Sequence, residues 1–383
     1  MWKHIAANAL TLLIVAMVLM AGVVTLGQRA FVAAGPLEQA ICLRIERGAS
    51  LRAVAASLAE QGAVASPALF RLGAQYDGRD GQLRFGAYLV PAGASMDQIL
   101  DLVTQGGAST CGTEVVLRIG VTQAGYLVRE LDPATSRFVE TLTLPLDTTE
   151  FPAAYQSVAA QADTRFRITV AEGATSWQVW TALEQAEFLT GSAAAAPPEG
   201  SLSPDSYEVR RGADRGELLA EMAARQAAIL AAAWEARVPG LPLASPEEAL
   251  ILASIVEKET GVADERRVVA AVFLNRLRVP MRLQTDPTVI DGITRGQSVL
   301  GRGLRRSELN APTPYNTYQI DGLPPTPIAN PGRASIEAVL NPETSPYLYF
   351  VADGSGGHAF AATLAEHNAN VARWRQIEAQ QGN

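Results

Sequence analysis

Two glutamates, Glu257 and Glu259, stand two positions apart in the stretch SIVEKETG at residues 254–261. A carboxyl group held among apolar side chains has its charged form disfavoured, so its pKa rises and it can keep a proton near neutral pH. A carboxylic acid of this kind is what a glycosidase uses to protonate a leaving oxygen. Which of the two carboxyls has apolar neighbours depends on the element that carries them.

The residues before the two glutamates predict the start of a helix. Ser245 is a suitable cap, Pro246 suits the first helical position, and Glu248 suits the third. We expect the helix to run from about Pro246 to Thr260 and to end at Gly261.

Helical spacing separates the two carboxyls. The apolar residues that precede them form one stripe, made by Leu252, Ile255 and Val256. Glu259 follows these residues by seven, four and three positions, so it projects from the stripe, whereas Glu257 is rotated by about 200° from it. The sequence therefore favours Glu259 as a catalytic acid. The structural alternative for the same side chain is an ion pair with Arg266 or Arg267, or a place in a polar seam.

A second amphipathic helix is predicted over residues 264–278, DERRVVAAVFLNRLR, with Asp264 as its cap. Its inward residues would be Val268, Val272 and Phe273. Further along, SPYLYFVADGSGGHAFAATLAEHN (residues 345–368) predicts a strand, a glycine turn and a final capped helix. We expect His358 to stabilise that turn rather than to bind a ligand.

Two loops after the second helix carry polar side chains that suit sugars: LQTDPT (residues 283–288) and PTPYNTY (residues 312–318). Their candidate substrate-binding residues are Gln284, Thr285, Asp286, Tyr315, Asn316, Thr317 and Tyr318. Tyrosine rings beside amides and hydroxyls match the apolar ring faces and many hydroxyls of a carbohydrate. The alternative is structural, in which Tyr315 and Tyr318 only fasten a loop to the core.

Composition argues against several other functions. The chain has 383 residues, 48% of them hydrophobic, so it can bury a core in two or three domains. A net charge of −8 leaves no basic field for nucleic acid. With only three histidines, no HExxH and no Cys-x-x-Cys, we expect neither a metal centre nor a cofactor. The sequence also lacks a G-x-S-x-G elbow and a Walker-type loop, so carboxylates are the remaining catalytic candidates.

The N-terminal segment predicts a membrane anchor. Residues 5–27 carry no charge, and at about 1.5 Å per residue they are long enough to cross a bilayer core of about 30 Å. Lys3 precedes the span and Arg29 follows it, so the charge signal for orientation is weak. We expect a retained single-pass anchor with its N-terminus in the cytoplasm. The alternative is a cleaved signal peptide, with VAAG at residues 32–35 as the cleavage site.

Three stretches share one pattern, Gly-Ala-Ser/Thr followed by apolar residues six and ten positions after the glycine: RGASLRAVAASL, AGASMDQILDLV and EGATSWQVWTAL, at residues 47–58, 92–103 and 172–183. The glycine allows a turn, and the hydroxyl can cap the helix that follows. Each stretch therefore predicts a strand, a turn and a capped helix. Such α+β modules weakly resemble the LysM-like glycan-binding fold. Cys42 and Cys111 either form a disulfide or remain two unpaired thiols.

The predicted fold class is α+β: an N-terminal transmembrane helix, small LysM-like modules, and a mixed α+β catalytic domain with a helix-borne glutamate. Residues 191–201, GSAAAAPPEGS, read as a linker or loop. The expected domains are a cytoplasmic tip (1–4), the transmembrane helix (5–27), a LysM-like module (28–110), a β-rich insertion (111–165), a second small module with a helical connection (166–244) and the catalytic domain (245–383).

At residues 245–375 the motifs resemble one known family. ASIVEKETG, ERR, VFLNRL and MRLQTDPTVI are followed by PYNTY, GLPPTPIANPG and PYLYFVADGSGGHAF, almost without gaps. Together they are similar to the YceG-like endolytic murein transglycosylases, the MltG proteins. EGSLSPDSY at 199–207 is a weaker match, because Ser203 replaces a bulky residue, and Pro280 stands where the family often has glycine.

The resemblance implies a lyase of cell-wall biogenesis that cleaves peptidoglycan between N-acetylmuramic acid and N-acetylglucosamine. The muramyl C6 hydroxyl replaces water and leaves a 1,6-anhydro end. Glu259-Thr260 is similar to the Glu-Ser pair of lysozyme-like transglycosylases, so the resemblance also selects Glu259. It implies that the two polar loops line the sugar groove. It also implies that one helix anchors the chain in the cell inner membrane, with its body in the periplasm. The enzyme would there end glycan strands beside synthases such as penicillin-binding proteins.

Two alternatives follow from the same residues. A muramidase would use water, with Asp286 or Glu257 as a second carboxylate. A non-catalytic, membrane-anchored scaffold would bind peptidoglycan through the repeated modules without cleaving it.

Overall fold

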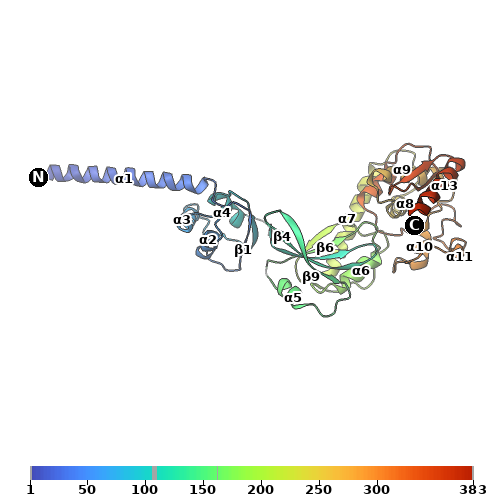
Figure 1. Ribbon diagram of the computed structural model, residues 1–383, viewed down its shortest axis with the longest axis horizontal. Helices are drawn as coiled ribbons and strands as arrows, with labels where there is room; N and C mark the ends of the chain where they lie inside the picture. The colour runs from blue at the N-terminus through green and yellow to red at the C-terminus, as the bar shows by residue number, and fades with distance from the viewer. Residues whose placement is uncertain (1, 106–109, 162, 382–383) are drawn as a thin grey trace. The chain divides into compact units, whose positions relative to one another are not determined.

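The computed structural model describes residues 2–105, 110–161 and 163–381, so residue 1 of the predicted tip lies outside it (Figure 1). The protein is a mixed α+β structure, as predicted. Its contacts divide it into two units. The first comprises Met1–Val115, Leu127–Thr143 and Thr149–Arg165, and the second Val116–Tyr126, Leu144–Thr148 and Phe166–Asn383. The finer domain boundaries stay a prediction.

Helix α1 (Trp2–Val32) contains the apolar N-terminal segment. Within the described residues, Leu10–Val32 is the one stretch of helix long and apolar enough to cross a membrane. Its large side chains are exposed, for example Leu12 at 71% and Met20 at 69%. Phe31, near its end, is buried in the core of the first unit. An exposed apolar helix of this length fits a membrane anchor.

The first unit is a two-stranded sheet packed with helices. Strand β1 (Ile41–Ile45) pairs antiparallel with β2 (Gly86–Val90), with Ile41 opposite Val90 and Ile45 opposite Gly86. The helices are α2 (Leu51–Glu60), α3 (Pro67–Tyr76) and α4 (Met96–Gln105). Their inward residues, which include Leu58, Phe70 and Ile99, are fully buried in one core with Leu43 of β1.

The strand, turn and capped helix predicted for all three repeated stretches is confirmed. Each glycine has a positive φ, at 79°, 68° and 79° for Gly48, Gly93 and Gly173. The Ser50 hydroxyl accepts a hydrogen bond from the Ala53 amide at 3.2 Å, which caps α2. Thr175 caps α6 (Ser176–Gln185) in a capping box with Gln178. The first two stretches belong to the first unit and the third to the second, so they are not three copies of one domain. Whether the first unit is LysM-like stays a prediction.

A disulfide joins Cys42 and Cys111, which resolves the alternative that the sequence left open. The two Cα atoms are 5.9 Å apart, and the bond closes a loop of 69 residues within the first unit. A cross-link of this span removes conformations from the unfolded chain, a gain of about 4 kcal/mol in the chain-entropy estimate.

We expect the Cys42→Ser, Cys111→Ser double variant to lose most of this stability. Amide hydrogen exchange in β1 and β2 measures it, because the opening free energy of these strands should fall by up to about 4 kcal/mol. Reductant should have the same effect on the wild-type chain and none on the double variant. Equal exchange rates in all samples would contradict the prediction.

Five other strands form one sheet with the order β5-β4-β3-β6-β8. These strands are β3 (Thr113–Ile119), β4 (Ala124–Asp132), β5 (Arg137–Pro145), β6 (Arg165–Val170) and β8 (Ser206–Val209). Strands β3, β4 and β5 lie within residues 111–165, the segment expected to be β-rich. Helix α5 (Ala153–Ala159) follows β5, and β7 (Leu189–Thr190) pairs in parallel with β9 (Ala213–Asp214). Residues 191–201 form a loop, as expected.

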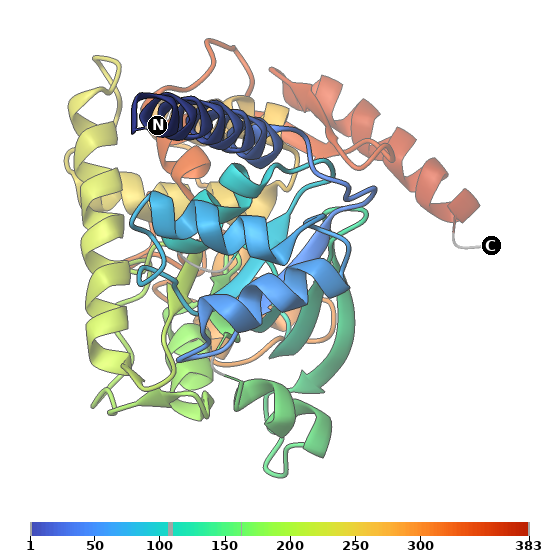
Figure 2. The ribbon, with the colours of Figure 1, turned by 90° about the vertical axis from the view of Figure 1, so that its left-hand side faces the viewer.

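Residues 215–381 are mainly helical. The elements are α7 (Arg215–Glu235), α8 (Pro246–Glu259), the short 3-10 helix η1 (Ala263–Glu265), α9 (Arg266–Arg278), α10 (Asp286–Thr294), α11 (Arg306–Leu309), α12 (Arg333–Leu340), the antiparallel strands β10 (Tyr349–Ala352) and β11 (His358–Ala361), and α13 (Leu364–Gln381). Figure 2 shows α7 as the long yellow-green helix. Helix α8 contacts α7, α9, α10 and α12, and its apolar side chains form the centre of their shared core.

The start predicted for α8 is confirmed, because the Ser245 hydroxyl accepts a hydrogen bond from the Glu248 amide at 3.3 Å. The helix ends at Glu259, with Thr260 as its C-cap. The cap predicted for α9 is wrong. Asp264 lies inside η1, and Glu265 is the residue at the start of α9, without a capping side-chain bond. The carboxylate of Glu265 instead accepts a hydrogen bond from the His358 amide at 2.8 Å.

Candidate active site

Glu259 is the last residue of α8, where the helix leaves the core. The three residues predicted to form its apolar stripe, Leu252, Ile255 and Val256, are fully buried. The Glu259 side chain is half-buried, and its Oε1 accepts a hydrogen bond from the Thr285 hydroxyl. Within the described residues Glu259 forms no ion pair, because Arg266 pairs with Glu172 and Arg267 donates to a backbone carbonyl. The ion-pair alternative is therefore not observed.

Burial raises the pKa of Glu259 above its ordinary value. The hydrogen bond from Thr285 lowers the pKa in part, and the neighbouring Asp286 carboxylate raises it. Electrostatic interactions with His358 and Arg276 lower it. The dominant cause is the one expected for a carboxyl at the edge of an apolar core, and it favours the protonated acid.

Thr285 is held in place from the far side by the loop at residues 312–318. Its amide donates to the Thr317 hydroxyl at 3.0 Å, and that hydroxyl also shares a hydrogen bond with Thr288 at 2.9 Å. The Gln284 amide donates to the Thr317 carbonyl at 3.2 Å. The side chains of the three threonines are buried, so this network is shielded from water. It links the polar loop to the residue that holds Glu259.

Three of the predicted substrate-binding residues have partly or fully exposed side chains next to this network. Gln284 and Asp286 are exposed, and Tyr318 is half-buried. The Tyr318 hydroxyl donates to Asp286 Oδ1 at 2.6 Å. Burial, followed by this carboxylate, raises the pKa of Tyr318 well above its usual range. Tyr318 is therefore a neutral hydrogen-bonding group beside Glu259.

Three other predicted residues have buried side chains that are bonded within the protein. The Tyr315 hydroxyl lies 2.7 Å from the Thr326 hydroxyl, and the Tyr315 ring belongs to the helical core. Asn316 is fully buried and donates to the carbonyls of three residues, Glu308, Leu309 and Ala311. Thr317 is also fully buried. In this structure these side chains shape the loop, as the structural alternative for Tyr315 supposed.

Arg276 is a residue of the site that the sequence argument missed. It is buried, and its guanidinium donates to the carbonyl of Leu348 at 2.7 Å. Burial lowers its pKa, while Tyr318 and Glu259 are among the neighbours that raise it. Arg276 follows Val272 and Phe273 by four and three positions, so the spacing rule that selected Glu259 would also have placed this charge on the apolar side of α9.

The two remaining carboxylates differ in what they can do. Glu257 Oε2 accepts a hydrogen bond from the Gly332 amide at 2.9 Å, so Glu257 has a structural partner. Asp286 lies close enough to raise the pKa of Glu259. His358 Nδ1 lies 2.6 Å from Glu265 Oε2, which agrees with a stabilising role for this histidine. Among the described residues, no three or more His, Cys, Asp or Glu side chains are grouped to hold a metal ion.

The chain is similar to known proteins of one family. The profile of the YceG-like family matches residues 43–156 and 146–373. A Bacillus subtilis (strain 168) protein named endolytic murein transglycosylase is 28% identical over 329 residues, which cover 85% of this chain and 82% of that protein. A Streptococcus pneumoniae (strain D39) protein of the same name is 26% identical, over 87% of this chain and 58% of that protein.

A solved structure is also similar. The crystal structure of a putative YceG-like protein from Listeria monocytogenes matches with a TM-score of 0.45 and 24% identity, over 87% of this chain and 99% of that one. The two profile matches together span most of the chain, including every residue of the candidate site. The chain therefore belongs to the YceG-like family.

Proposed function

We propose that this chain is an endolytic lytic transglycosylase that cleaves peptidoglycan glycan strands between N-acetylmuramic acid and N-acetylglucosamine. Relatives that cover most of this chain are named endolytic murein transglycosylases. The observation that carries the proposal is the placement of Glu259, at the edge of an apolar core, with a raised pKa and a hydrogen bond from Thr285.

One carboxyl group is sufficient for this reaction. Protonated Glu259 gives its proton to the glycosidic oxygen as the bond from that oxygen to the muramyl C1 breaks. The resulting carboxylate takes the proton of the muramyl C6 hydroxyl, whose oxygen forms a new bond to C1. No water is consumed, and the acid is regenerated. Burial favours the first step by keeping the proton on Glu259, and the positive charge of Arg276 offsets the carboxylate formed before the second.

The other residues take two roles in this proposal. Gln284, Asp286 and Tyr318 have accessible polar groups near Glu259, and we assign them to sugar binding. Thr285 orients the carboxyl of Glu259. The buried residues Tyr315, Asn316 and Thr317 hold the loop in shape, so their effect on substrate passes through Thr285 and Tyr318.

The apolar helix supports a location at the membrane. In the proposal, the helix spans the cell inner membrane once, with the N-terminus in the cytoplasm and the body in the periplasm. A disulfide agrees with an oxidising compartment such as the periplasm. There the enzyme would meet newly made strands and the synthases that polymerise them, and end the strands.

Product analysis tests the reaction. The full chain in detergent is incubated with purified, uncrosslinked glycan strands, and the fragments are weighed by mass spectrometry. We expect internal cleavage with 1,6-anhydro-muramyl ends, each lighter by one water than the corresponding reducing end. Reducing ends would show a muramidase that uses water, with Asp286 as the nearby second carboxylate. Strand binding without any fragment would show the scaffold alternative.

A further inference from the structure

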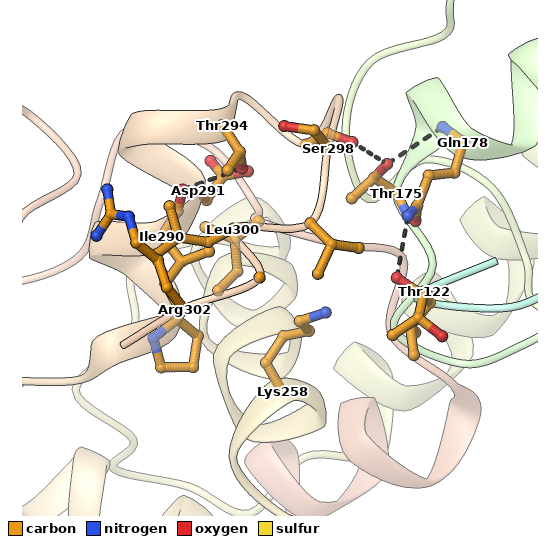
Figure 3. Close-up of a pocket in the computed structure, with 16 residues that line it drawn as sticks. Thr122, Thr175, Gln178, Lys258, Ile290, Asp291, Thr294, Ser298, Leu300 and Arg302 are labelled. Atoms are coloured by element: carbon orange, nitrogen blue, oxygen red, sulfur yellow. Dashed lines mark hydrogen bonds between the residues drawn. The ribbon is translucent and has the colours of Figure 1, made fainter. Parts of the chain in front are cut away.

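The second unit contains a hollow whose lining includes sequence neighbours of the candidate active-site residues (Figure 3). None of the candidate active-site residues themselves lines it. Its volume is about 320 Å³. Lys258 of α8 and Pro287 of α10 line it, and they are the direct neighbours of Glu259 and Asp286. Its remaining walls come from the turn between β3 and β4, the start of α6, the rest of α10 and the loop at residues 296–302. Helices α8 and α10 thus contribute to both places.

Asp291 is the unusual residue of this hollow. It is buried, with 9% of its surface exposed, and it lines the hollow from α10. Within the part of the chain that the structure describes, its carboxylate has neither a hydrogen bond nor an ion pair. Buried carboxylates in proteins are almost always bonded, so the oxygens of Asp291 are available to a donor that enters the hollow. Burial, and then the charge of Glu199, raises the pKa of Asp291 to about 7.

Lys258 supplies a donor with spare capacity. Its Nζ donates to the Gly173 carbonyl at 3.3 Å, which uses one of its three N–H groups. Lys258 and Asp291 affect each other's pKa, form no ion pair with each other, and both line the hollow. The opposite charges together favour a neutral, dipolar ligand. An ammonium ligand would be repelled by Lys258, and a carboxylate ligand by Asp291.

Several other polar side chains of the hollow are already bonded within the protein. The Thr175 hydroxyl donates to the Gly296 carbonyl at 2.6 Å, and Gln178 Nε2 donates to the Val121 carbonyl at 3.0 Å. The Arg302 guanidinium pairs with Glu308 at 2.6 Å. The apolar part of the lining comes from Val121, Pro287, Ile290, Val299, Leu300 and Ile328. The hollow therefore offers the Asp291 carboxylate as an acceptor, the Lys258 ammonium as a donor, the hydroxyls of Thr122 and Ser298, and an apolar wall.

We propose that this hollow binds a secondary amide of the glycan substrate. The amide N–H donates to Asp291, the carbonyl oxygen accepts from Lys258, and the alkyl end packs against the apolar wall. The acetamido group of an N-acetylated amino sugar has this arrangement, with a methyl of the right size for an apolar contact. A peptide bond shares the same chemistry. The inference rests on the proposed function for its substrate class, since peptidoglycan strands carry both kinds of amide.

The binding test uses the full chain in detergent with Glu259→Gln, so that no ligand is consumed. Isothermal titration calorimetry measures three probes: an N-acetylglucosamine tetramer, the same tetramer without its acetyl groups, and a stem peptide without sugar. We expect the N-acetylated tetramer to bind, and the added Asp291→Ala and Lys258→Met substitutions each to weaken it about tenfold, the effect of one lost charge-assisted hydrogen bond. Asp291→Asn keeps an acceptor oxygen and should lose less. Asp147→Ala, at an exposed aspartate outside the hollow, is the matched control.

The outcomes separate the possible ligands. If only the stem peptide depends on Asp291, the amide is a peptide bond, and the ligand class stands. If the deacetylated tetramer binds as well as the acetylated one and depends equally on Asp291, the hollow is an ammonium site and the inference is overturned. The inference is also overturned if Glu259→Gln binds every probe equally well with and without the added Asp291→Ala substitution. Strand cleavage by the chain with Glu259 intact is scored separately, so failure of the proposed reaction is not confused with failure at the hollow.

Discussion

Glu259→Gln should reduce glycan cleavage by a factor of about 100 to 10,000, the range expected when a general acid and base is removed. Glutamine has the shape of the glutamic acid and can still accept the hydrogen bond from Thr285 through its amide oxygen. It can neither give up a proton to the leaving oxygen nor take one from the C6 hydroxyl. The change therefore removes the chemistry and keeps the packing. Fragment release from purified strands, measured by mass spectrometry, checks it.

The same substitution two residues earlier is the matched control. Glu257 lies on the same helix, and a glutamine there can still accept the hydrogen bond from the Gly332 amide. We expect Glu257→Gln to cleave strands at close to the wild-type rate, with unchanged folding by circular dichroism. Full activity in Glu259→Gln would exclude Glu259 as the catalytic residue. Equal loss in both variants would point to a general effect on α8.

Asp291→Asn should stabilise the second unit at neutral pH. The folded protein raises the pKa of Asp291 from 3.8 to about 7, because its carboxylate is buried. Between these values the folded state holds a proton that the unfolded chain has released, so wild-type stability falls as the pH rises from about 4 to 7. Above pH 7 the loss is complete, at up to about 4 kcal/mol, since each pKa unit corresponds to about 1.4 kcal/mol. Asparagine carries no charge, so the variant avoids this loss.

Denaturant unfolding followed by tryptophan fluorescence measures the difference. Trp177, Trp180, Trp234 and Trp374 all lie in the second unit, so the signal reports mainly on that unit. The gain of Asp291→Asn over wild type should be small near pH 4 and grow until pH 7. A gain that does not change with pH would contradict the prediction.

Glu308→Gln is a control for which the expected change in stability with pH has the opposite sign. The bond to the Arg302 guanidinium, helped by the Arg305 amide, lowers the pKa of Glu308 to about 2. The ionised carboxylate therefore stabilises the folded state above about pH 4.5, and this contribution is lost as the pH falls towards 2. Glu308→Gln should be less stable than wild type at neutral pH, and the difference should vanish in acid. As the pH rises, Asp291→Asn therefore becomes more stable than wild type, whereas Glu308→Gln becomes less stable than wild type.

The features that could be predicted from the sequence depend on neighbours along the chain. The cap at Ser245, the start of α8 and the burial of Leu252, Ile255 and Val256 all follow from spacings within one helix, and the structure agrees with them. The glycine turns and hydroxyl caps of the three repeated stretches are local in the same way. Local geometry has few solutions, because each backbone unit has only two soft dihedral angles and each helix end must satisfy its own amides.

The roles of the polar loop residues could not be predicted in this way. Tyr315, Asn316 and Thr317 have the composition of a sugar site, but the structure buries them and uses their polar atoms within the protein. Whether a tyrosine or an amide meets solvent is decided by segments that are distant along the chain. The partner of Thr317, for example, is Thr285, 32 residues away.

Residue types and helical phase favour Glu259 as the carboxyl of the proposed chemistry, because an acid that follows an apolar stripe is a property of one helix. Folding decides which groups surround that carboxyl and which are left without a partner. It brings Arg276 and Thr285 to Glu259, bonds Glu257 to Gly332, and leaves Asp291 facing a hollow. These results depend on desolvation and charge between distant segments, and both exist only once the chain has packed.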